Sequence, residues 1–119
     1  MSNNFDVLYG KKITNVVIYS DLITFTFSDG DEYELCPSQG TNYGNNEFTV
    51  PKKYTSKTHP SRLNGRIVRS IGYYRNESRS DYNTYYVVYV ITTDGYRHEF
   101  EMVSPQNFYS SYIELFKTQ

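Results

Sequence analysis

The sequence predicts a mainly β fold of antiparallel sheets, and three observations lead to this prediction. Apolar and polar residues alternate with a period of two in several segments, which is the spacing of a half-buried strand. Two Asp-Gly pairs, at residues 29–30 and 94–95, supply the positive φ angles that tight hairpins need. The composition also favours strands, because 14 Tyr and 7 Phe are present while the helix former Ala is absent.

The first predicted strands lie in residues 8–35. This segment opens with the motif Leu-x-Gly-basic and continues as a strand through 16–18. Residues 22–27 form the next strand, in which the apolar side chains share one face. The Asp-Gly corner then returns the chain as a strand over 32–35, with its acidic residues directed outward. These three strands make one antiparallel meander.

A second meander is predicted over residues 63–102, because the same features follow in the same order. Leu-x-Gly-basic recurs, a long apolar strand covers 85–92, and the second Asp-Gly corner leads into 96–102. The extra residues of this copy fall at 75–84, a polar stretch that we expect to be a long hairpin loop or an extension of two strands. An internal repeat of 8–35 in 63–102 accounts for this symmetry, and chance similarity between two meanders is the alternative.

The connection between the meanders, residues 37–60, is rich in Gly, Asn, Ser, Thr and Pro, and only 47–50 has the pattern of a strand. Long connections inside a compact domain are often functional. In the tail, Ser104-Pro105 is a good helix start, while residues 112–116 alternate as a strand does. The alternation favours a final strand, and one short C-terminal helix is the alternative.

Chain length and the N-terminal residues limit the protein class. At 119 residues the chain has the size of a single domain, so we expect one domain over residues 1–119. Residues 1–6 lack the basic and apolar parts of a signal peptide, and no apolar run reaches the length of a membrane span. We therefore expect a cytoplasmic protein with no membrane partner.

Catalytic and metal-binding motifs are missing from the sequence. One cysteine, Cys36, and two histidines cannot supply an internal disulfide or a zinc ligand set. No Gly-rich phosphate loop, nucleophile elbow or acidic metal cluster is present. His98 shares an apolar face with Tyr96 and Phe100, so we expect a hydrogen-bonded core residue there rather than a catalytic base. The sequence predicts a protein that is not an enzyme and takes no cofactor or metal.

Basic residues are concentrated in the middle of the chain. Residues 52–80 carry eight basic and one acidic side chain, although the whole chain has a net charge of −1. Tyrosines interleave these cations, a combination that contacts phosphates and bases on nucleic-acid surfaces. Surface ion pairs with the acidic strands, and contact with an acidic patch of a protein partner, are the alternatives. The candidate contact residues are Lys52, Lys53, Tyr54, Lys57, Arg62, Arg66, Arg69, Tyr73, Tyr74, Arg75, Arg79 and Tyr82.

The opening Leu8-x-Gly10-Lys11-x-Ile13-x-x-Val16 is followed by the strand at 22–27, its Asp-Gly corner and a Tyr-rich segment at 107–111. In these features the chain resembles a family of small phage- or prophage-borne proteins classed as domains of unknown function. The resemblance covers most of the chain, although residues 37–60 replace a more acidic, Cys-containing stretch of that family. It implies a phage setting, no known catalytic residues, and an accessory protein that binds and blocks a host or defence component.

These observations lead to one functional hypothesis and one alternative. The hypothesis is a non-catalytic, phage-derived binding protein, comparable to an anti-CRISPR protein, that inhibits or redirects a host or defence protein in the host cytoplasm. Tyr and Arg, which concentrate binding energy in interfaces, are abundant in its candidate surface. The alternative is nucleic-acid or nucleotide binding through residues 52–79. Exposed edge strands would also allow a homodimer.

Overall fold

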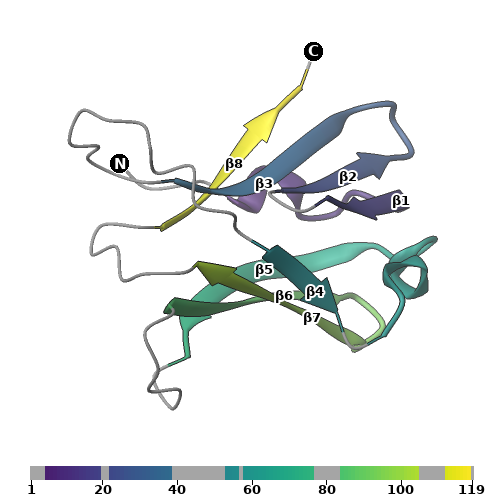
Figure 1. Cartoon of the computed structure of the whole chain (residues 1–119). Helices are drawn as coiled ribbons and strands as arrows, with labels where there is room; N and C mark the ends of the chain where they lie inside the picture. The colour runs from purple at the N-terminus through teal and green to yellow at the C-terminus, as the bar shows by residue number, and fades with distance from the viewer. Residues whose placement is uncertain are drawn as a thin grey trace.

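The computed structural model describes residues 5–19, 22–38, 53–56, 58–76, 84–104 and 112–118, and over these ranges the fold is mainly β, as predicted. Two antiparallel four-stranded sheets stack as two layers (Figure 1). Sheet 1 has the strand order β1-β2-β3-β8, with β1 at Ile13–Ile18, β2 at Ile23–Phe27, β3 at Glu32–Ser38 and β8 at Tyr112–Lys117. Sheet 2 has the order β4-β7-β6-β5, with β4 at Lys53–Ser56, β5 at Val68–Arg75, β6 at Thr84–Thr92 and β7 at Arg97–Ser104.

Both halves of the chain build their first three strands in the same way. A short 3-10 helix, η1 at Phe5–Leu8 or η2 at Pro60–Leu63, precedes a glycine with a φ of 88° at Gly10 and 85° at Gly65. The next strand carries a bulge at its start in both halves, at Ile13/Asn15 in β1 and Val68/Ser70 in β5. The Asp-Gly corners then join β2 to β3 and β6 to β7, so the two meanders share the same backbone plan.

The two meanders cross where β1 and β5 begin. Lys12 and Ile67 form an antiparallel bridge there. On one side of the bridge the amide of Gly10 donates to the carbonyl oxygen of Val68 at 2.8 Å, and on the other the amide of Gly65 donates to that of Ile13 at 2.7 Å. Because each hydrogen bond has its counterpart in the other half, a pseudo-twofold axis passes through this crossing.

Each half also places its last strand in the other half's sheet. The strand β4, which follows the first meander, pairs with β7 of the second, and β8, which follows the second meander, pairs with β3 of the first. The 3-10 helices are exchanged in the same sense, because η1 packs against β5 and η2 packs against β1. Neither sheet is therefore made by one half of the chain alone.

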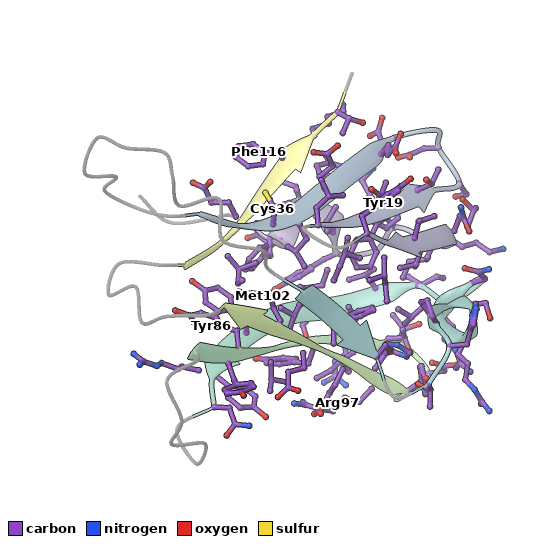
Figure 2. All side chains as sticks on the ribbon, viewed as in Figure 1. Tyr19, Cys36, Tyr86, Arg97, Met102 and Phe116 are labelled. Atoms are coloured by element: carbon purple, nitrogen blue, oxygen red, sulfur yellow. The ribbon has the colours of Figure 1, made fainter. Side chains whose placement is uncertain are left out.

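The core lies between the two sheets. It is formed by the inward faces of both three-stranded meanders and of β8. Phe25 of sheet 1 meets Phe100 of sheet 2 edge to face, with 6.3 Å between ring centroids. Figure 2 shows Met102 in the same layer between the sheets. The buried apolar side chains that form the cluster include Leu8, Ile13, Ile23, Phe27, Leu35, Leu63, Val68, Val88, Val90 and Ile113.

Several sequence predictions concern the connections and the tail. The predicted final strand over 112–116 is confirmed as β8. The connection predicted over 37–60 was too broad, because β3 continues to Ser38, the segment also contains β4, and η2 begins at Pro60. These elements are short, which leaves little periodic signal in the sequence. The predicted strand at 47–50 lies outside the described residues, and so does most of the 75–84 stretch between the end of β5 and the start of β6.

Candidate functional site

Ion pairs connect the two Asp-Gly corners to the crossing of the meanders. Lys11 pairs with Asp29, and this hydrogen bond raises the pKa of Lys11 and lowers the pKa of Asp29. At the equivalent place in the second half, Arg66 pairs with Asp94 and its guanidinium lies 4.2 Å from the ring centroid of Tyr96. The pKa of Asp94 is lowered, first by the hydroxyl of Thr92 and also by Arg66. These basic residues are therefore engaged within the fold.

A polar cluster surrounds His98, which is buried in β7 as expected. The ring lies 4.8 Å from that of Phe100, centroid to centroid. Its Nε2 is 2.8 Å from Oγ of Ser56 in β4, and its Nδ1 is 2.9 Å from the hydroxyl of Tyr96. Burial lowers the pKa of His98, and the charge of Arg62 lowers it further. A neutral imidazole in β7 therefore links β7 to the neighbouring edge strand β4.

The hydrogen bonds of Ser56 decide which ring nitrogen of His98 carries the proton. The hydroxyl of Ser56 donates to the carbonyl oxygen of Thr58 at 2.6 Å, so its single hydrogen is not available to His98. We therefore assign the proton to Nε2, which donates to Ser56, while Nδ1 accepts from Tyr96. A nucleophilic serine needs the reverse arrangement, in which the histidine accepts its proton. This cluster is arranged to hold β4 in place.

The outer face of sheet 2 carries a platform of two tyrosines and an arginine. The guanidinium of Arg97 lies 4.3 Å from the ring centroid of Tyr89, and Tyr74 places its ring 6.3 Å from the same ring. We call Tyr74, Tyr89 and Arg97 the aromatic platform. Figure 2 shows Arg97 on the side of sheet 2 that faces away from sheet 1. Arg97 is also oriented by Glu99, at 2.8 Å from Nε to the carboxylate.

Gly72 explains why the platform can lie flat on the sheet. This residue pairs with Tyr89 across β5 and β6. A Cβ added to Gly72 would stand 2.4 Å from the hydroxyl oxygen of Tyr89 and 2.6 Å from its Cζ. The ring of Tyr89 therefore covers the backbone of Gly72 and fills the space that a side chain at position 72 would need. Such a close approach is a recognised reason for glycine inside a strand.

The structure separates the candidate contact residues that the sequence grouped. Tyr74 and Arg69 are exposed on β5, Arg62 is exposed on η2, and Arg75 is exposed at the end of β5. Tyr73 points inward instead, with its ring edge to face against those of Phe5 and Tyr86. Lys53 and Tyr54 belong to β4, although the positions of their side chains are not described. The residues Lys52, Lys57, Arg79 and Tyr82 lie outside the described ranges.

Sequence reasoning missed Tyr89 and Arg97. Both occupy outward positions of strands that were predicted correctly, and Gly72 inside the apolar strand opposite was the available signal, because glycine in a strand marks a close approach. The sequence does not show which residue of the neighbouring strand pairs with Gly72, so Tyr89 could not be identified as the residue that approaches it.

No group of three or more His, Cys, Asp or Glu residues in the described ranges could hold a metal ion. Within the same ranges, no helix is long and apolar enough to cross a membrane. Comparisons of the chain with protein-family models, with curated proteins and with solved structures found no match.

Proposed function

We propose that this chain is a non-catalytic protein-binding module that uses the aromatic platform of sheet 2 as its contact surface. The observation that carries the proposal is the stack of Arg97 on Tyr89, with Tyr74 beside it, on an outward sheet face. Tyr and Arg are the residue types that concentrate binding energy in interfaces. A tyrosine also presents a large contact area while it loses little conformational entropy on binding.

The platform is supported in a way that suits binding. Gly72 brings the Tyr89 ring onto the backbone, and Arg97 is held between this ring and the carboxylate of Glu99. Side chains that are already ordered lose less entropy when a partner arrives, and this saving raises affinity. Tyr74 remains 46% exposed, so a partner can still bury a large part of its ring.

The chain offers a matched control for this surface. Tyr19 directly follows β1 and stands as far along the chain from Gly10 as Tyr74 stands from Gly65, and it is 52% exposed. The experiment captures partners on the immobilised chain from lysates of bacteria, including cells that express nuclease-based defence systems. Binding of a purified stoichiometric partner is then measured for wild type, Tyr74→Ala, Arg97→Ala and Tyr19→Ala.

We expect Tyr74→Ala and Arg97→Ala to weaken the complex by about 2 kcal/mol each, roughly thirtyfold in Kd, as for central interface residues. Tyr19→Ala should leave the affinity within about twofold, because an exposed residue away from the contact changes binding little. Recovery of no stoichiometric partner, or equal losses for Tyr19→Ala and Tyr74→Ala, would remove the proposal.

The finer proposal is that the partner is a host or defence protein and that the chain is phage-derived. Its support is the resemblance in the opening motif and the Asp-Gly corner, together with the platform. The alternative of nucleic-acid binding receives less support, because Arg66 is paired with Asp94 inside the fold and does not add its charge to a phosphate surface. A gel-shift series with single-stranded DNA tests it, since phosphate contacts give an affinity that falls steeply with salt.

A further inference from the structure

Some basic side chains in the described part of the chain have an acidic partner, and others do not. Lys11, Arg66, Arg97 and Lys117 form ion pairs within the fold. Lys12, Arg62 and Arg69 form none with any described residue, and all three are exposed. On the acidic side, Glu32, Glu34 and Glu114 likewise have no ion pair within the described ranges. These two sets of uncompensated charges lie on different surfaces of the molecule.

Two of the uncompensated cations, Lys12 and Arg69, lie at the crossing of the two meanders, whereas Arg62 lies on η2. Lys12 is paired with Ile67, so their side chains leave the same side of the bridge. Arg69 follows Ile67 by two residues and lies in the bulge at the start of β5, next to Val68, whose carbonyl oxygen accepts from the amide of Gly10. Tyr9, the neighbour of Gly10, is 44% exposed. Ile67 is 38% exposed. We call Tyr9, Lys12, Ile67 and Arg69 the basic ribbon.

The uncompensated acids lie on the outer face of sheet 1. Glu32 and Glu34 alternate along β3, which directs both side chains to this face. On the neighbouring strand β8, Glu114 pairs with Cys36 and Phe116 pairs with Glu34. Phe116 is 48% exposed, and Figure 2 shows it on the side of β8 away from sheet 2. We call Glu32, Glu34, Glu114 and Phe116 the acidic face.

We propose that the chain self-associates, with the acidic face of one copy docked on the basic ribbon of another. Each surface combines charges that have no ion pair with a described residue and an exposed apolar side chain, and the two sets of charges are opposite in sign. Complementary charge of this kind orients partners and disfavours other arrangements. The contact joins two different patches, so it is heterologous. It uses neither the aromatic platform nor the proposed binding partner.

The occupant is a protein surface rather than a nucleic acid because apolar groups accompany the cations. Tyr9 and Ile67 would be buried against Phe116, which gives the contact an apolar centre. Two cations and a net charge of −1 for the chain are a weak electrostatic basis for a phosphate backbone. A second copy is present at the same concentration as the first and carries the required acids.

Charge reversal on each surface tests the proposal directly. Sedimentation velocity of the whole chain at low ionic strength, over increasing concentration, should show a mass above the monomer's 14.0 kDa. Lys12→Glu/Arg69→Glu alone, and Glu34→Lys/Glu114→Lys alone, should each weaken association at least about tenfold, because like charges then face each other. An equimolar mixture of the two variants should associate as wild type does, because opposite charges face each other again.

The repeat supplies a control for the effect of net charge. Glu99 occupies in β7 the place that Glu34 occupies in β3, on the outer face of the other sheet. Glu99→Lys should leave self-association unchanged, whereas Glu34→Lys weakens it. Wild-type association should also disappear at about 1 M salt, where the Debye length is only about 3 Å.

Four results would overturn the proposal. The first is a wild-type chain that stays monomeric at millimolar concentration and low salt. The second is a mixture of the two reversed variants that associates no better than either variant alone. The third is association that Glu99→Lys weakens as much as Glu34→Lys. The fourth is binding of single-stranded DNA to the Lys12 and Arg69 surface by a chain that remains monomeric. Because recovery in the mixture requires both variants to be folded, misfolding cannot imitate the expected result.

Discussion

Leu8 joins the two halves of the molecule, and its replacement by alanine measures how strongly they depend on each other. The side chain is fully buried and comes from η1, which packs against β5 of the other meander. Removing about three methyl or methylene groups costs about 2.4 kcal/mol of transfer free energy. A residual cavity of about 70 Å³ adds about 1.7 kcal/mol, so we expect Leu8→Ala to lower the free energy of unfolding by about 4 kcal/mol.

Calorimetry and urea unfolding followed by tyrosine fluorescence measure this loss, since the chain has no Trp. A loss of this size lowers the Tm by about 15 °C for a domain of this length. Val7→Ala is the matched control, because Val7 precedes Leu8 in the same helix and is 45% exposed. An exposed substitution of this kind changes stability by no more than about 0.5 kcal/mol.

The pseudo-twofold arrangement extends this prediction to the second half. Leu63 of η2 is also fully buried, and η2 packs against β1. Leu63→Ala should therefore cost about the same as Leu8→Ala, and both variants should unfold in one transition. A loss below about 1 kcal/mol, or a transition that splits into two, would show that the halves fold independently and would refute the reasoning.

Three further predictions concern single residues of the second half. The free energy of unfolding should fall as the pH drops below 6.5, the ordinary pKa of histidine, because His98 is held neutral in the fold and takes up a proton when the chain unfolds. Urea unfolding over a series of pH values measures this fall, and His98→Gln should remove the contribution of His98 to it. Arg66→Ala should cost about 1 kcal/mol in thermal unfolding through loss of its contacts with Tyr96 and Asp94, and a change below about 0.3 kcal/mol would contradict that role. Gly95→Ala should cost about 1 kcal/mol by the same measurement, because its φ of 89° strains a residue with a Cβ even though no neighbour is close, whereas an unchanged Tm would argue against such strain.

Local structure was predictable where it depends on residues close in sequence. The alternation at 22–27 places Ile23, Phe25 and Phe27 on the buried face of β2. The Asp-Gly corners have the positive φ that the hairpin pattern requires, 90° at Gly30 and 89° at Gly95. Both features follow from steric and periodic rules that act over a few residues.

The contact surfaces were harder to predict because they join residues that are distant in sequence. Tyr89 lies on Gly72, and Arg97 lies on Tyr89, so the aromatic platform draws on three strands. Arg66 and Arg69 give the same signal in a sequence, yet of these two only Arg66 forms an ion pair with a described acidic residue. Charge composition alone does not show which cation is compensated within the fold.

The sequence by itself determined the class of the fold and the strands of both meanders. It also showed that the glycine motif at Gly10 recurs at Gly65 and that the Asp-Gly corner at 29–30 recurs at 94–95. Only the tertiary structure decided that β4 joins the second meander and β8 the first, and that Lys12 and Arg69 meet no acidic side chain among the residues that the structure describes. The physical reason is that alternation records which face of a strand is buried, whereas strand edges and side-chain charges select their partners in space, where residues far apart along the chain compete for the same positions.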